Sequence, residues 1–270
     1  MDVYSVVCKF YQNIRAEKRI IGKSVLNRNI YAVKIGDGYP VGIAQYALHG
    51  REYITSMLAL IHAQIGVYKG TLWVLPLTNP DGALLSQCGI QSVNNKHIKK
   101  CLLALNNGDN FSLWKANAHG VDLNVNFDAE WGKGIKNIRV AGAENYIGKK
   151  PFSEPESRAL MRFTRFIKPD YTVSYHTKGE EIYRLFGASS HTCPLEMRLA
   201  NSLSQTTGYP LKIAQGSVGG YKDWCIQALR IPSFTVEVGK EEYKHPLDEK
   251  ALADITQKNK YALYELSKEF

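Results

Sequence analysis

A histidine and a glutamate lie three residues apart in the stretch YALHGREYITSM, at residues 46–57. His49 ends a mostly apolar run, and Glu52 falls in the first turn of the helix that we expect to follow. An imidazole and a carboxylate placed in this way can face one point, and both are zinc ligands. The same spacing also fits a simpler interpretation, in which Glu52 only complements the helix dipole.

A second histidine decides between these interpretations. His176 ends the apolar segment YTVSYH and is followed by Thr177-Lys178-Gly179, a loop that lets its imidazole reach a cleft. Two histidines, one glutamate and an open position for water form a catalytic zinc set. We therefore predict that His49, Glu52 and His176 bind one zinc ion per chain. A core histidine satisfied by backbone is the alternative for His176.

A lone carboxylate, Glu237, interrupts the apolar segment FTVEVG at residues 234–239. Burying this group without a partner would cost several kcal/mol, and a metal or its water would supply that partner. A carboxylate beside such a water can take its proton and deliver it to a leaving amine. We predict this general base and acid role for Glu237; a glutamate on an edge strand facing solvent is the alternative.

The segments that carry these residues alternate between strand and helix patterns. Residues 24–35 predict a hairpin, and four buried strands are expected in PVGIAQYALHG, TLWVLPL, PDYTVSYH and PSFTVEVG. Helices are expected in REYITSMLALIHAQIG, in SEPESRALMRFTRFI and from Pro246 to the end, the second with a capping box of Ser153 and Glu156. Residues 79–82, NPDG, predict a turn, and residues 84–110 a loop-rich or weakly helical stretch. This alternation predicts an α/β sandwich with a largely parallel or mixed sheet.

The composition is that of a globular protein. With 270 residues, of which 44% are hydrophobic and 22% charged, the chain is long enough for one α/β domain with a substantial core. We predict a single domain over residues 1–270, with residues 1–20 as a helical extension packed on it. One face of this extension would carry Val3, Val7, Phe10 and Ile14.

The N-terminal stretch lacks the layout of a signal peptide, because Lys9 breaks its short apolar run. No run approaches the roughly 18 apolar residues that a membrane span needs. The five cysteines form no CxxC pair and leave an odd one over, which favours reduced thiols. We therefore expect a cytoplasmic protein with no membrane partner.

The net charge of +9 calls for an anionic partner. The densest basic cluster, residues 96–100, has no aromatic residue interleaved, which favours a solvated loop over nucleic-acid binding. A small acidic substrate suits the charge equally well, and the sequence leaves the oligomeric state open.

Several motifs then follow in an order that resembles a known family. HGRE, NPDG, WKANAHGVDLNVNFDAEWG, SYHTKG, GGYKDW and TVEVG are similar to segments of the carboxypeptidase A-like zinc metallopeptidases, from about residue 22 to the end. WKANAHGVDLNVNF, ENYIGKKPFSEPE and YHTKGEEIYR resemble more closely the bacterial γ-D-glutamyl-meso-diaminopimelate peptidases, which cut peptidoglycan stem peptides. The resemblance implies a three-layer α/β/α sandwich around a mixed, twisted eight-stranded sheet, with one zinc.

The resemblance also implies residue roles. His49, Glu52 and His176 would hold zinc and Glu237 would be the base. Lys115 matches the position of a family arginine that stabilises the oxyanion, although it lacks the guanidinium fork and is also compatible with a solvated loop lysine.

The substrate's carboxylate must be bound in a different way from that usual in the family. Asn124 matches a family asparagine that helps to hold the substrate's terminal carboxylate, but the arginine that follows it in the family is Val125 here. A valine cannot make the bidentate salt bridge by which an ordinary carboxypeptidase recognises a free C-terminus. Efficient trimming of ordinary protein C-termini is therefore not expected.

Other side chains are candidates for the missing contact. Lys178, Arg184 and Arg139 lie in segments shared with the diaminopimelate branch, and any of them can meet an acidic group. Diaminopimelate carries two carboxylates and an extra amine, so relocated cations and a nearby acid such as Asp223 would suit it. Tyr221 is expected to contact substrate, in place of the family's mobile tyrosine.

The remaining histidines receive no ligand role. His62 is expected to be structural, and His119 to lie at the rim of the cleft or behind the ligands. No role is assigned to His97, His191 and His245.

The leading hypothesis is a zinc-dependent peptidase that hydrolyses the γ-D-glutamyl-meso-diaminopimelate amide of peptidoglycan stem peptides or muropeptides. One alternative is another zinc amide hydrolase of the same fold, related to N-acyl amino acid deacylases, against which Val125 also counts. A non-catalytic binder of cell-wall peptides is a third, although all three ligand candidates and Glu237 are retained. The sequence does not decide between cleavage inside a chain and at its end, or between intact wall and soluble fragments.

Overall fold

The computed structural model describes residues 1–187 and 193–270, so that His191 lies outside the described residues. Its centre is an eight-stranded mixed sheet with the order β1-β2-β4-β3-β5-β8-β6-β7. The strands are β1 Lys18–Lys23, β2 Asn29–Asp37, β3 Val41–Tyr46, β4 Gly70–Leu75, β5 Tyr171–His176, β6 Glu181–Tyr183, β7 Leu211–Lys212 and β8 Ser233–Glu237. The mixed eight-stranded sheet expected from the resemblance is confirmed.

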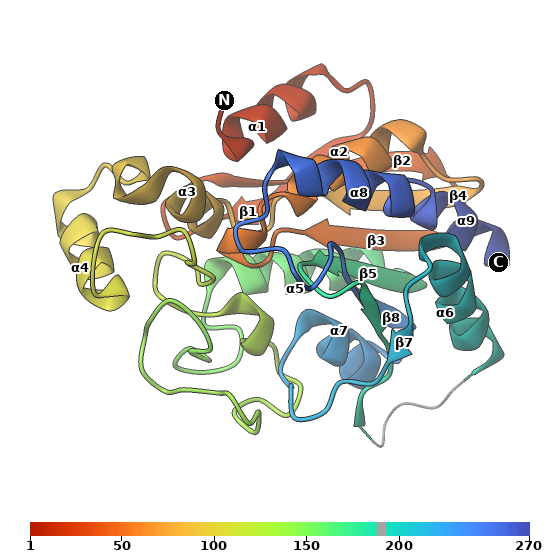
Figure 1. Ribbon diagram of the computed structural model, residues 1–270. Helices are drawn as coiled ribbons and strands as arrows, with labels where there is room; N and C mark the ends of the chain where they lie inside the picture. The colour runs from red at the N-terminus through yellow and green to blue at the C-terminus, as the bar shows by residue number, and fades with distance from the viewer. Residues whose placement is uncertain (188–192) are drawn as a thin grey trace.

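Helices cover both faces of this sheet (Figure 1). They are α1 Val3–Asn13, α2 Thr55–Ile65, α3 Pro80–Cys88, α4 Lys96–Asn106, α5 Pro155–Ile167, α6 Pro194–Thr207, α7 Tyr221–Trp224, α8 Glu249–Asn259 and α9 Ala262–Leu266. One hydrophobic cluster joins the sheet to α2, α6, α8 and α9, and another joins its opposite face to α5 and α7. The three-layer α/β/α arrangement is therefore confirmed. Over the described residues, no helix has both the length and the apolar character needed to cross a membrane.

Strands β3, β5 and β8 position the functional residues. They are neighbours in the sheet and run parallel to one another. Each is buried along nearly its whole length, which explains why its sequence is almost continuously apolar rather than alternating. Because carboxyl ends of parallel strands meet at one edge, His176 lies directly beside Glu237 in the register.

Some local predictions were wrong at their boundaries. The N-terminal helix ends at Asn13, and residues from Lys18 onward pair with β2 as an edge strand, so residues 1–20 are not helical throughout. The hairpin is present, but its first strand is β1, which ends at Lys23, so the hairpin begins before residue 24 and residues 24–28 connect its strands. The segment from Pro246 onward forms α8 and α9 rather than one helix.

Two further predictions missed helix starts. Residues 79–82 do not form an isolated turn, because Asn79 is the N-cap and Pro80 the first residue of α3. Residues 84–110 contain the rest of α3 and all of α4, and are more helical than expected. The expected capping box of α5 is absent, because Glu154 is the N-cap residue and the Glu156 carboxylate accepts from Val25 N and Asn117 Nδ2 instead.

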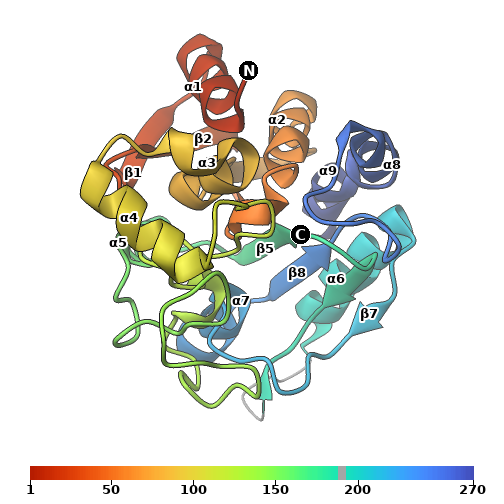
Figure 2. The ribbon, with the colours of Figure 1, turned by 60° about the vertical axis from the view of Figure 1, so that its left-hand side comes forward.

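The long segment between α4 and α5 has little regular structure, with a single short 3-10 turn at Leu123–Val125 among its assigned elements. Figure 2 shows this segment, in yellow-green, beside α7. Phe127 N donates to Gly219 O, just before α7, and Asp122 N donates to Tyr146 O within the segment. The segment therefore carries Asp122 and its neighbours to the edge of the sheet where β5 and β8 end.

His62 in α2 is buried and should make stability depend on pH. Its Nδ1 accepts from the Tyr46 hydroxyl at 2.5 Å, its Nε2 lies 2.9 Å from Asn259 O, and burial lowers its pKa to about 4. Below about pH 6.5 the unfolded chain takes up a proton here while the native state does not. The free energy of unfolding should therefore fall by about 3 kcal/mol between pH 6.5 and 4 from this group.

Urea unfolding of chelated protein between pH 7 and 4 measures this effect. A His62→Gln variant should lose less stability on acidification than the wild type, whereas His97→Gln, at an exposed position in α4, should behave as the wild type does. Equal pH dependence of His62→Gln and wild type would contradict the assignment.

Candidate metal centre

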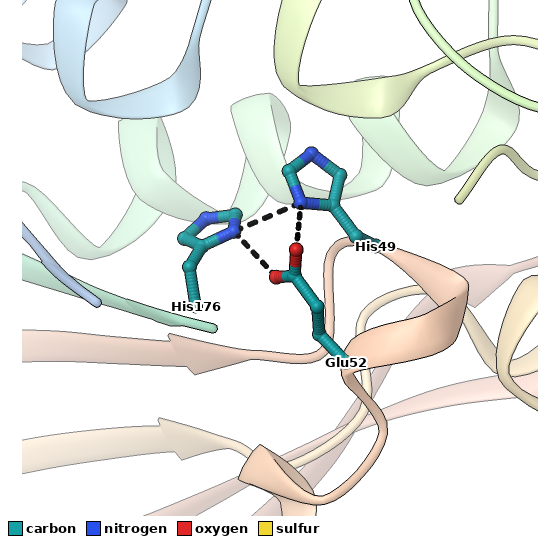
Figure 3. A group of neighbouring side chains, drawn as sticks. All are labelled: His49, Glu52 and His176. Atoms are coloured by element: carbon teal, nitrogen blue, oxygen red, sulfur yellow. Dashed lines mark hydrogen bonds and ion pairs between the residues drawn. The ribbon is translucent and has the colours of Figure 1, made fainter. Parts of the chain in front are cut away.

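Three side chains from two separate segments converge at the edge of the sheet (Figure 3). His49 and Glu52 come from the turn that follows β3, and His176 ends β5. His49 Nδ1 lies 2.9 Å from Glu52 Oε1, His176 Nδ1 lies 2.9 Å from Glu52 Oε2, and the two Nδ1 atoms are 3.1 Å apart. All three side chains are buried.

This donor set fits a metal ion. One ligand atom from each residue lies within 4.8 Å of the others, and two imidazoles with one carboxylate suit zinc. Burial opposes the charge on Glu52, but the neighbouring His49 and His176 hold its pKa well below the usual range. The two ring nitrogens and the buried carboxylate all face one point. A cation or a proton shared between them is needed to balance the carboxylate's charge and the nitrogen lone pairs. The three residues could therefore hold zinc, and this role remains a prediction.

Asp122, which was not singled out from the sequence, lies next to the predicted zinc ligand His49. It is fully buried, and its Oδ1 lies 3.2 Å from His49 Nε2 while its Oδ2 lies 2.8 Å from Lys115 Nζ. Burial opposes its charge, but Lys115 and His49 hold its pKa well below the usual range. A carboxylate behind a ligating histidine fixes the ring's orientation and tautomer. The available signal was an acid in the otherwise apolar run Val121-Asp122-Leu123.

The structure places Lys115 beside the centre rather than in solvent. Burial would lower the pKa of its ammonium, but Asp122 raises it, so the side chain keeps its charge. Its carbonyl accepts from Gly50 N at 2.9 Å, next to His49. Lys115 thus places a positive charge near the predicted ligands. Its role in stabilising the oxyanion stays a prediction.

Glu237 shares a pocket with Asn124. Burial raises the pKa of Glu237 to about 7, partly opposed by His176, and Glu52 raises it further. A carboxyl group with a pKa near neutrality can both accept and return a proton at working pH. Asn124 Oδ1 accepts from Tyr221 N at 3.1 Å, which orients its amide. These two predicted residues therefore lie at one site.

The pocket has a volume of about 260 Å³ and contains both signs of charge. Lys222 and Asp223, 6% and 4% exposed, lie in its wall with Lys222 Nζ 2.5 Å from Asp223 Oδ1. Other lining residues are Asn124, Tyr183, Gln215, Ser217, Thr235 and Glu237. Asp223 was named from the sequence but Lys222 was not; the available signal was its place beside Asp223 in the first turn of α7.

Two predicted substrate contacts face elsewhere. Tyr221 is fully buried, and its hydroxyl lies 2.8 Å from Thr164 Oγ1 in the core, so the structure contradicts its expected contact with substrate. Arg184 forms a buried ion pair with Glu196, its Nε donating to Oε1 at 2.7 Å, and it does not line the pocket. The expectation for Arg184 is therefore also wrong.

The other candidates lie at the margin. Lys178 Nζ is 3.0 Å from Glu241 Oε1, and its contact with substrate stays a prediction. Arg139 lies over the Trp131 ring at 5.6 Å. His119 Nδ1 is 2.8 Å from Glu154 Oε2, with 58% of its side chain exposed.

Comparison with known proteins agrees with this geometry. The profile of the zinc carboxypeptidase family matches residues 11–262. Gamma-D-glutamyl-L-diamino acid endopeptidase 1 of Lysinibacillus sphaericus is 34% identical over 249 residues, covering 85% of this chain and 62% of that protein. The chain thus spans less than two thirds of that relative's length.

Two solved structures share the fold. Bovine thrombin-activatable fibrinolysis inhibitor, in complex with tick carboxypeptidase inhibitor, superposes with a TM-score of 0.76 at 18% identity, covering 99% of this chain and 96% of that one. Murein-tripeptide amidase from Escherichia coli O157 superposes with a TM-score of 0.64 at 21% identity, covering 96% and 95%. With the matched profile and the converging His49, Glu52 and His176, these findings show that the chain belongs to the zinc carboxypeptidase family of zinc-dependent peptidases.

Proposed function

We propose that the chain hydrolyses the γ-D-glutamyl-meso-diaminopimelate amide of peptidoglycan stem peptides or muropeptides. The observation that carries this proposal is the pocket beside Glu237, which contains a buried ammonium and a buried carboxylate, Lys222 and Asp223. Diaminopimelate ends in a distal carboxylate and ammonium of its own, so it matches both charges. The 34% identity to a relative named for cleavage before a diamino acid supports the same substrate class.

Lys222 retains the capacity to bind a substrate carboxylate. Its ammonium donates to Leu185 O at 2.9 Å and to Asp223 Oδ1, and an ammonium group offers three donors. Among the described residues these are its two hydrogen-bond partners, so the third donor can bind a carboxylate oxygen. Asp223 Oδ2 accepts from Gly220 N at 3.1 Å, which fixes its carboxylate in the wall where an ammonium group can approach. This pair would replace the contact that Val125 cannot make.

The reaction follows from the positions of the polar groups. Zinc, when bound, activates water and polarises the scissile carbonyl. Glu237 accepts the proton of the attacking water and later delivers it to the amine that leaves. Lys115 stabilises the negative charge on the carbonyl oxygen, and Asp122 keeps both Lys115 and His49 in place.

Mass spectrometry of L-Ala-γ-D-Glu-meso-Dap incubated with zinc-loaded protein tests the activity. An α-linked peptide and a chelated sample serve as controls. Release of free diaminopimelate that a chelator abolishes, with the α-linked peptide intact, is the expected result. No cleavage by protein that holds one zinc per chain would reject this substrate.

Replacement of Lys222 by methionine tests the recognition of the distal carboxylate. KM for the diaminopimelate peptide should rise about 10- to 100-fold, because a hydrogen bond to a charged group contributes about 1.5–3 kcal/mol. A substrate with L-lysine in place of diaminopimelate lacks that carboxylate and should be much less affected. The control Lys212→Met removes an exposed lysine and should leave both KM values unchanged. Equal effects of Lys222→Met on both substrates would assign the residue a structural role.

A further inference from the structure

Asn79 does more than cap a helix. Its side chain is fully buried, and its Oδ1 accepts from Gly82 N at 2.9 Å, which is the ordinary cap of α3. A cap needs only this oxygen. The amide nitrogen also donates to Leu48 O at 3.2 Å and to Ala116 O at 3.1 Å. All the donor capacity of the amide is thus used on two other segments of the chain.

Those two segments carry the centre. Leu48 directly precedes His49, and Ala116 directly follows Lys115. Asn79 N also donates to Ala47 O at 3.0 Å. A single buried side chain therefore connects the backbone beside a predicted zinc ligand to the backbone beside a predicted catalytic cation.

Close packing keeps this junction from shifting. A Cβ atom on Gly82 would lie 2.3 Å from Ala116 O, and one on Gly50 would lie 2.5 Å from Gly82 O and 2.7 Å from Trp114 O. Carbon atoms do not approach backbone at such distances. The backbones around Gly50, Gly82 and Ala116 are therefore in direct contact, and a small displacement of one is transmitted to the others.

We propose that Asn79 is a positioning residue, which fixes the separation of His49 and Lys115 and thereby the chain of contacts His49–Asp122–Lys115. Its loss would leave the carbonyls of Leu48 and Ala116 buried without this donor and let the two segments relax apart. The catalytic part of this inference rests on the proposed function, whereas the effect on zinc binding does not.

The variant Asn79→Ser separates the two tasks of the residue. Serine is a preferred N-cap and can still accept from Gly82 N, but it is too short to reach both carbonyls. We expect the zinc dissociation constant, measured by chelator competition, to rise about tenfold, and kcat to fall about tenfold with KM within about threefold. The matched control is Asn95→Ser, the N-cap of α4, whose oxygen accepts from His97 N and Ile98 N at an exposed site. It should change neither quantity.

A double-mutant cycle with Lys115→Met distinguishes positioning from general destabilisation. If Asn79 acts through Lys115, Asn79→Ser should reduce kcat much less in the Lys115→Met background than in the wild type. Equal reductions in both backgrounds would show that Asn79 does not act through Lys115. If Asn79→Ser does not fold, Asn79→Asp carries the same test, because it keeps the cap and the volume but loses both donors.

The outcomes separate this inference from the proposed function. Folded Asn79→Ser or Asn79→Asp with wild-type zinc affinity and wild-type kcat would overturn the positioning role. A wild-type protein that binds zinc but leaves the γ-glutamyl peptide intact would reject the proposed substrate. In that case a zinc dissociation constant unchanged in both Asn79 variants would still overturn the positioning of His49, and a raised one would support it.

Discussion

Replacement of Glu237 by glutamine should lower kcat about a thousandfold while zinc stays bound. General acid and base catalysis contributes about 10²- to 10⁴-fold, and an amide in this position can neither accept nor return the proton. Glu237 is not a member of the group formed by His49, Glu52 and His176, so its loss should leave the predicted ligands in place. Steady-state kinetics and the bound zinc per chain, measured on the same samples, check both parts.

A matched control is available on the neighbouring strand. Glu181 lies opposite Glu237 in the antiparallel register of β6 and β8, and its carboxylate accepts from the Tyr183 hydroxyl at 2.8 Å. Glu181→Gln should retain kcat within about threefold, because this carboxylate is engaged by Tyr183 and is not part of the proposed proton transfer. Wild-type kcat in Glu237→Gln would mean that another group is the base.

Replacement of His176 by alanine should abolish tight zinc binding and activity together. Two protein ligands then remain of the three that a catalytic zinc requires, and Glu52 loses one of the imidazoles that balance its buried charge. Excess zinc should raise the melting temperature of the wild type, since a ligand at about 1,000 times its dissociation constant stabilises by about 4 kcal/mol. It should leave the melting temperature of His176→Ala unchanged.

Thermal unfolding with and without zinc provides the measurement. The control His119→Ala removes a half-exposed histidine that pairs with Glu154, and it should keep the zinc-dependent shift. Stoichiometric, tight zinc binding by His176→Ala would show that the metal is held by a different set of residues. Such a result would also remove the basis for the roles assigned to Asp122 and Lys115.

The predicted site residues that the structure brings together and those that it places elsewhere differ in how local their sequence signals are. His49, His176 and Glu237 could be singled out because each lies at or just beyond the carboxyl end of an apolar strand, and such ends meet at one edge of a parallel sheet. Tyr221 and Arg184 were misassigned because their partners, Thr164 and Glu196, lie elsewhere in the chain and draw them away from the pocket.

The same distinction holds for the fold. The strand and helix alternation around β3, β5 and β8 was visible as apolar patterns, because burial on both faces of a central strand is recorded in its own sequence. The start of α3 at Asn79 was missed because NPDG fits both a turn and a capped helix start.

The sequence by itself determined the α/β class, the strand ends and the residue types that can bind zinc and move a proton. Only the tertiary structure decided that the pair Lys222–Asp223 lines the pocket and that the pair Lys115–Asp122 lies beside His49. It also showed that Asn79 joins two segments of the centre. The physical reason is that hydrophobic periodicity is a local property of each element, whereas a buried ion pair or a bridging amide depends on which distant groups the fold brings within hydrogen-bonding distance.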